Sequence, residues 1–131
     1  MGIKYIWDTN IVIYYLQQQF PPSAEAFMDE VAEEALPLIS AITEIELLCW
    51  KSASEKDLKV LHNFINDAKV IELEKRIKHK TADIRKKRQV KLPDAIIAAT
   101  AVVYNMPLIT RNTKDFDKIE GLHLINPWTV R

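Results

Sequence analysis

The chain has 131 residues, about the size of one domain, and its 48% hydrophobic and 27% charged residues are typical of a folded protein rather than a disordered one. Eighteen basic and eighteen acidic residues give a net charge of zero, so overall charge does not indicate a polyanionic partner. Two glycines exclude a glycine-rich phosphate-binding loop, and one cysteine excludes an internal disulfide and a cysteine-based zinc site.

Targeting signals are missing from the sequence. No apolar run is long enough to cross a bilayer, and the N-terminus lacks a cleavable signal pattern. A lone cysteine, Cys49, suits a reducing compartment, and its apolar surroundings favour a place in the core over a catalytic role. We therefore expect a single cytoplasmic domain over residues 1–131.

The chain begins with a predicted strand. Residues 3–7 form a short apolar run that ends at Asp8, which predicts a buried strand followed by a helix over residues 11–19. A proline pair ends that helix. Ser23 is then expected to cap a second helix that runs to about residue 35.

The middle of the chain continues the alternation of strands and helices. Residues 36–40 predict a second strand, and residues 43–50 a helix in which Thr43 and Glu46 fit a capping box. Residues 54–67 predict a further helix. Its expected apolar face consists of Leu58, Leu61, Phe64 and Ile65.

Charge is unevenly distributed along the chain. Residues 5–50 contain no lysine or arginine, whereas residues 75–91 contain nine basic residues and one acid, Asp83. This basic segment follows a third predicted strand, residues 69–73, and is expected to form a helix over residues 74–89. Such a segment is either a solvated helix face or a surface that attracts a polyanion.

The last part of the chain completes an α/β pattern. Residues 93–105 predict an alanine-rich helix, and residues 113–119 a short turn or helix. Two more strands are predicted at residues 107–110 and 122–125. Short apolar strands that alternate with helices indicate a mainly parallel sheet of four to five strands with helices on both faces.

Four carboxylates occupy conspicuous places in this pattern: Asp8, Glu46, Asp94 and Asp115. Each alone has a structural explanation, because acids are favoured as helix caps and in first helical turns. Asp8 and Asp115, however, follow predicted strands, and sites in open α/β sheets gather at the carboxyl ends of strands. Acidic side chains therefore stand where this architecture usually places chemistry.

Four motifs occur in order along the chain: "DTN" after the first strand, "ITEIEL" in the middle helix, "LPDAIIAATA", and "LITRNTKDF". Together they resemble the PIN domain, in particular the VapC-type ribonuclease toxins of prokaryotic toxin–antitoxin pairs. The resemblance covers essentially the whole chain. It implies a three-layer PIN fold and a metal-dependent endoribonuclease whose products carry a 5′-phosphate and a 3′-hydroxyl.

The resemblance also implies a set of site residues. Its acidic quartet matches Asp8, Glu46, Asp94 and Asp115. Glu44 and Asp117 are lesser rivals, because Glu46 directly precedes a leucine and Asp115 directly precedes a phenylalanine, as the family pattern requires. The polar positions that support the quartet are matched by Asn10, Thr110 and Asn112.

A quartet of carboxylates implies a divalent cation. Converging carboxylates repel one another, and oxygen ligands favour Mg²⁺ or Mn²⁺ over zinc. Asp8 and Asp94 are the first choice for direct ligands, with Asp115 and Glu46 binding a second ion or orienting the attacking water. The spacing of the three histidines does not support a metal site, and we expect each of them at the surface or with its hydrogen bonds satisfied: His62, His79 and His123.

An RNA substrate and protein partners follow from the same resemblance. The candidates for contacts with the RNA backbone are Arg85, Lys86, Lys87, Arg88 and Arg111. Related toxins bind a small VapB-like antitoxin and usually form homodimers. Apolar residues that suit such contacts, or the core, are Ile13, Tyr14, Tyr15, Leu48 and Trp50.

Two alternatives remain open from the sequence. A phosphoacceptor signalling module would need an acidic pair near the first strand and a lysine after a late strand, whereas this chain has Asp8 alone and Arg111. A PIN-fold RNA-processing nuclease or RNA-binding module outside toxin–antitoxin systems fits the same motifs. Intact carboxylates argue against a module that only binds.

Overall fold

The computed structural model of the chain describes residues 3–51 and 53–130. The strands in this part of the chain are β1 (Ile6–Trp7), β2 (Leu38–Ser40), β3 (Lys69–Ile71), β4 (Leu108–Ile109) and β5 (Leu124–Ile125). The helices are α1 (Thr9–Leu16), α2 (Pro22–Glu34), α3 (Ala41–Leu48), α4 (Glu55–Asp67), α5 (Lys75–Lys87), α6 (Leu92–Val103) and α7 (Thr113–Phe116). The five strands form one sheet in the order β3-β2-β1-β4-β5, and every neighbouring pair is parallel.

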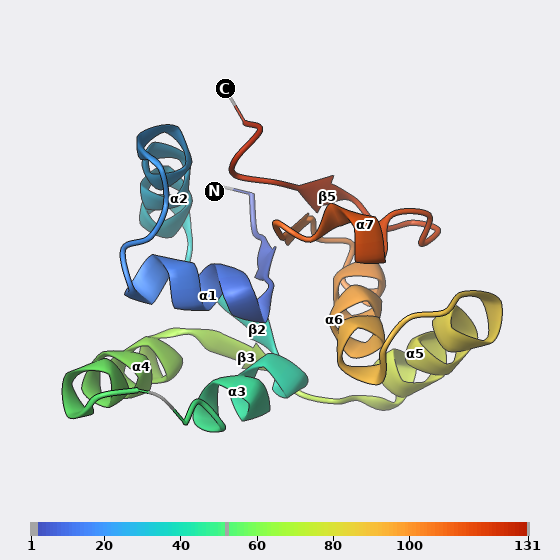
Figure 1. Cartoon of the computed structure of the whole chain (residues 1–131). Helices are drawn as coiled ribbons and strands as arrows, with labels where there is room; N and C mark the ends of the chain where they lie inside the picture. The colour runs from blue at the N-terminus through green and yellow to red at the C-terminus, as the bar shows by residue number, and fades with distance from the viewer. Residues whose placement is uncertain (1–2, 52, 131) are drawn as a thin grey trace.

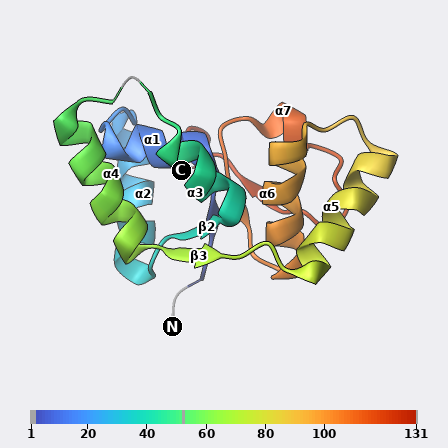
Figure 2. The same cartoon turned by 90° about the horizontal axis from the view of Figure 1, so that it is seen from below.

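Each face of the sheet has its own hydrophobic core. Successive strand residues point to opposite faces, so Ile6 and Leu38 belong to one core while Trp7 and Ile39 belong to the other. The first core is covered by α5, α6 and α7, and the second by α1, α2 and α4 (Figures 1 and 2). The predicted parallel sheet with helices on both faces is therefore confirmed.

The position of α3 matters most for the site. It contacts both α1 and α6, and Figure 2 shows it between the two groups of helices. Its Leu47 packs in one core and its Ile42 against the other. Because α1 and α3 both begin where a parallel strand ends, their N-termini share one edge of the sheet.

The start of α3 differs from the prediction. Ser40 is the N-cap, and its Oγ accepts a hydrogen bond from the Thr43 backbone N–H at 3.1 Å. The predicted capping box of Thr43 and Glu46 is therefore wrong, because a buried serine that ends β2 already caps the helix. Glu46 thus lies beyond the first turn, and its side chain is available for the site.

The other helix and strand ends also differ in detail. The predicted cap Ser23 is wrong: α2 begins at Pro22, since a proline in the first turn needs no backbone N–H. α1 stops at Leu16, and Gln18 then adopts a left-handed φ of 55°. The strands are shorter than the apolar runs, and the run ends Ile3 and Leu36 are 61% and 66% exposed.

Some predicted core positions lie at the surface. Cys49, expected in the core, is exposed because it caps the C-terminal end of α3 on the outer side of the helix. Leu58 is 38% exposed, since α4 turns Leu61 and Phe64 inward instead. Of the five candidate contact residues, Leu48 is exposed and the other four are partly buried against the second core. No helix among the described residues combines the length and apolarity that a membrane crossing requires.

Candidate functional site

The structure brings four carboxylates into one electrostatic cluster. The pKa of Asp8 is raised to about 6, first by burial and then by the negative charges of Asp94 and Glu46. The pKa of Asp94 is also raised, first by burial and then by the charges of Asp115 and Glu46. The charges acting on these two groups come from Glu46 and Asp115 rather than from their sequence rivals, Glu44 and Asp117.

Asp8 is held at both oxygens. It follows β1 as the N-cap of α1, and its side chain is 6% exposed. Its Oδ1 accepts a hydrogen bond from the Thr9 backbone N–H, and its Oδ2 accepts one from Thr110 Oγ1, both at 2.8 Å. These bonds lower the pKa and so oppose the effect of burial. The carboxylate of Asp8 is thereby fixed at the carboxyl end of β1, the central strand of the sheet.

A chain of hydroxyl groups positions Glu46. Thr9 Oγ1 donates to Glu46 Oε1 at 2.7 Å and lies 3.0 Å from Thr43 Oγ1. Ser40 Oγ in turn donates to Thr43 Oγ1 at 3.1 Å. Thr9 lies inside the "DTN" motif, but no role was predicted for it from the sequence. Through it, the N-terminus of α1 sets the direction of a carboxylate on α3.

Asp94 and Asp115 approach from the other group of helices. Asp94 lies in the first turn of α6, with the cationic Lys91 as N-cap, and Asp115 lies in the first turn of α7. Asn112 Nδ2 donates to Asp115 Oδ2 at 2.6 Å. Alanines that α6 buries allow close packing on the sheet: Ala95, Ala98, Ala99 and Ala101. Small core residues therefore bring Asp94 to the edge where Asp8 lies.

A hollow of about 370 Å³ opens beside Asp8. Asn10, Tyr14, Arg111 and Asn112 form its other walls. Asn10 and Asn112 are both exposed, whereas Thr110 is fully buried behind them. Of the three predicted supporting residues, Thr110 and Asn112 hold carboxylates by hydrogen bonds, and Asn10 lines the hollow.

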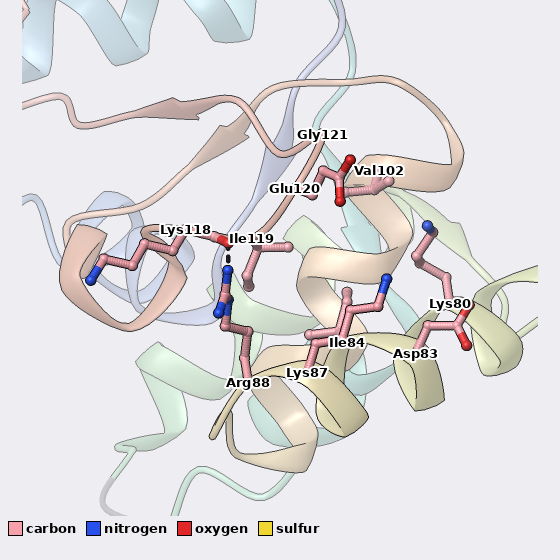
Figure 3. Close-up of a pocket in the computed structure, with 10 residues that line it drawn as sticks. All are labelled: Lys80, Asp83, Ile84, Lys87, Arg88, Val102, Lys118, Ile119, Glu120 and Gly121. Atoms are coloured by element: carbon pink, nitrogen blue, oxygen red, sulfur yellow. Dashed lines mark hydrogen bonds between the residues drawn. The ribbon is translucent and has the colours of Figure 1, made fainter.

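A basic groove leads toward the cluster from the side of α5. Figure 3 shows this hollow of about 320 Å³, which is lined by two acids, Asp83 and Glu120, and by four basic residues: Lys80, Lys87, Arg88 and Lys118. Arg88 Nε donates to the Lys118 carbonyl oxygen at 3.2 Å. A second hollow of about 180 Å³ shares Arg88 and Lys118 with the first and is also lined by Asp115. The basic surface therefore reaches Asp115, one of the four carboxylates.

Two further predicted basic residues, Arg85 and Lys86, lie on α5. Arg85 Nε donates to the Val90 carbonyl oxygen at 3.1 Å, and Arg85 lines a further hollow together with Arg88 and Lys91. Lys86 is exposed on α5. Sequence reasoning missed Lys118, which lies after α7 and outside the basic run. Its contribution depends on the fold and leaves no local pattern.

The donor set suits a hard divalent cation. All four side chains are carboxylates. The negative charges around Asp8 and Asp94 raise the pKa of both groups, so a cation bound there would relieve the repulsion. No group of three such side chains in the described residues is close enough to enclose an ion. A Mg²⁺ ion bound here would therefore be held by one or two carboxylates and would keep several waters, as is typical of this ion. All three histidines are exposed.

Comparison with known proteins gives consistent matches. The PIN-domain family model matches residues 5–122. The tRNA(fMet)-specific endonuclease VapC of Shigella flexneri is 27% identical over 128 residues, which is 92% of this chain and 95% of that protein. DNA-bound VapBC from Salmonella typhimurium matches with a TM-score of 0.79, 25% identity and coverage of 96% and 99%. A toxin–antitoxin complex from Klebsiella pneumoniae matches with a TM-score of 0.72, 31% identity and coverage of 97% and 100%.

Proposed function

The chain belongs to the PIN-domain family, and on that basis we propose that it is a VapC-type endoribonuclease, the toxin of a toxin–antitoxin pair, that hydrolyses RNA with a divalent cation. The observation that supports this proposal is that the negative charges of Asp94 and Glu46 raise the pKa of Asp8, while those of Asp115 and Glu46 raise the pKa of Asp94. A nuclease of this kind needs such a cluster beside a surface that accepts phosphate.

Each residue has a proposed task. Asp8 and Asp94 would hold Mg²⁺ or Mn²⁺, while Asp115 and Glu46 would bind a second ion or orient the attacking water. When bound, such an ion supplies Lewis-acid chemistry that stabilises charge on the phosphoryl oxygens. Thr9 fixes the direction of Glu46 by a hydrogen bond. The reaction needs no covalent nucleophile from the protein.

The groove of Figure 3 is the proposed path of the RNA backbone. Lys87 and Arg88 line the groove. A second hollow, which shares Arg88 with the groove, is also lined by Asp115. Contacts between such cations and phosphates release counterions and position the strand, but they do not read its sequence. The other proposed backbone contacts are Arg85, Lys86 and Arg111.

Substrate and partners are proposed from the relatives. The Shigella flexneri protein is named as specific for tRNA(fMet), so tRNA is the first substrate to examine. Since the matched Klebsiella pneumoniae structure is a toxin–antitoxin complex, we propose a small antitoxin as partner, together with a homodimer. Leu48 on α3, 55% exposed, offers an apolar contact for either.

The test is RNA cleavage by the purified chain without its partner. Initiator tRNA, other tRNAs, rRNA and mRNA would be incubated with Mg²⁺ or Mn²⁺, and parallel samples would contain EDTA. We expect cleavage only with the metal, and a loss of about 10²- to 10³-fold in Asp94→Asn, because removing one preorganised charged group typically costs this much. Cleavage that persists in EDTA would overturn the proposed chemistry.

Two variants on one helix give a matched comparison. Glu46→Gln removes a charge that acts on both Asp8 and Asp94. Glu44→Gln removes an equal charge from the first turn of the same helix, α3. We expect Glu46→Gln to lose most of the activity and Glu44→Gln to keep it. Equal losses would show that the variants act through the stability of α3 instead.

A further inference from the structure

Arg111 is held by two aromatic rings at the mouth of the hollow beside Asp8. Its guanidinium carbon lies 4.3 Å from the centre of the Trp128 ring and 5.8 Å from that of Tyr14. Its Nη1 also donates to the Tyr14 hydroxyl at 3.2 Å. Stacking on ring faces leaves most of the N–H donors at the edge of the guanidinium available to a ligand.

The rings themselves are anchored. The Trp128 ring packs on Tyr14 at 5.1 Å and on Phe20 at 5.2 Å between centroids, as part of the second core. The backbone N–H of Trp128 donates to Asn126 Oδ1 at 3.0 Å, which fixes the turn after β5. The arginine is therefore oriented before any ligand arrives, which reduces the entropy lost on binding.

The surroundings suit a phosphate with its sugar. Arg111 is exposed, and its side chain contacts Tyr14 and Trp128. The hollow of about 370 Å³ is within the size range of small-molecule sites, and the side-chain amides of Asn10 and Asn112 line it. Amides and a guanidinium are donors for sugar and phosphate oxygens.

Trp128 lies beyond the part of the chain that the family model matches, residues 5–122. We propose that this hollow binds one nucleotide next to the bond that is cut, that Arg111 binds its phosphate, and that Trp128 is a positioning residue for Arg111. This inference rests on the proposed ribonuclease function. It gives the turn at residues 126–129 a role in positioning Arg111, a role that the motifs do not assign.

The test measures cleavage kinetics and RNA affinity separately. Arg111→Gln is expected to raise KM for the cleaved tRNA about 10- to 100-fold, because a charge-assisted phosphate contact is lost, with a much smaller change in kcat. Affinity is measured in Asp94→Asn, which is expected to lose cleavage. Adding Arg111→Gln to this variant should weaken its binding of a fluorescently labelled single-stranded RNA by a similar factor. Arg111→Lys should recover only part of the binding, since an ammonium does not form the same fork of donors.

Trp128 needs its own variants. Trp128→Leu is expected to raise KM about 3- to 10-fold, as for the loss of a cation–π contact, and Trp128→Phe should retain much of the affinity. In Trp128→Leu combined with Arg111→Gln, the loss should be no larger than in Arg111→Gln alone, because the tryptophan acts through the arginine. Thermal unfolding of each variant would separate this effect from a loss of folded protein.

A matched control exists at the other end of α5 and α6. The guanidinium carbon of Arg76, near the start of α5, lies 5.5 Å from the centre of the Tyr104 ring. Tyr104 is the C-cap of α6, at the opposite end of that helix from Asp94, so Arg76→Gln should leave KM unchanged. If the wild type cleaves RNA and Arg111→Gln leaves KM and affinity unchanged, or lowers kcat alone, the nucleotide subsite is wrong and the ribonuclease proposal stands. Additive losses in the double variant would overturn the positioning role of Trp128. A wild type that neither cleaves nor binds RNA overturns both proposals.

Discussion

Asp8 combines two demands that oppose each other. A metal ligand must be ionised, yet burial and the charges of Asp94 and Glu46 raise the pKa of Asp8 to about 6. When the pKa is higher in the folded than in the unfolded chain, the group contributes stability below the unfolded pKa and loses it as the pH rises through the folded pKa. Without metal, the ionised Asp8 therefore lowers stability near neutral pH.

Asp8→Asn should accordingly stabilise the metal-free protein. In EDTA, we expect a free energy of unfolding about 1–3 kcal/mol above that of the wild type at about pH 7.5, with the difference falling below about 1 kcal/mol near about pH 4. Urea unfolding at both pH values measures it. Added Mg²⁺ should stabilise the wild type more than the variant. A variant less stable at both pH values would show that the hydrogen bonds from Thr9 and Thr110 outweigh the cost of burial.

The sequence indicated which residues to consider for the candidate site, but not the contacts that position their side chains. Asp8 and Asp94 were predicted because the local motifs that contain them, "DTN" and "LPDAIIAATA", resemble those of the PIN domain. The bond between Thr9 and Glu46 joins residues 37 positions apart and leaves none. The stacking of Arg111 on Trp128 depends likewise on how the turn after β5 folds back over α1.

At the scale of elements, the sheet and its helices were predicted, whereas the helix starts were less certain. Ser40 is both the last residue of the buried strand β2 and the N-cap of α3. In the sequence, an apolar run that ends in a serine predicts the strand but not the start of a helix. Thr43, one turn later, then resembles the cap. The difference has a chemical consequence, because the true cap belongs to the hydroxyl chain that leads to Glu46.

Two serine caps allow a controlled test of this connection. Ser40→Ala should lower the free energy of unfolding by about 1–2 kcal/mol, because a buried cap is lost, and should lower RNA cleavage about tenfold, because Thr43 and Thr9 lose a partner. Ser54→Ala removes the exposed cap of α4, which forms a capping box with Asp57, and should lower stability alone. Urea unfolding and RNA cleavage report the two effects. Unchanged cleavage by folded Ser40→Ala would contradict a role of the hydroxyl chain in positioning Glu46.

At the scale of the molecule, a net charge of zero conceals a strong separation of charge. The acidic cluster at the sheet edge is formed largely by elements that carry no lysine or arginine, and the basic groove by α5 and the turn after α7. An RNA strand drawn along the groove would meet the carboxylates where Arg88, Lys118 and Asp115 line one hollow. Composition alone cannot show this, because it sums the charges without placing them.

The salt dependence of RNA binding tests where the charge acts. Lys87→Gln with Arg88→Gln removes two cations from the groove, while Lys75→Gln with Lys78→Gln removes two from the opposite end of α5 and changes the net charge equally. In an Asp94→Asn background, we expect the first pair to reduce the slope of log Kd against log salt by about one to two, since each lost phosphate contact lowers it by about 0.7–1. The second pair should leave the slope nearly unchanged. Equal reductions would mean that RNA responds to the charge of the whole helix rather than to the groove.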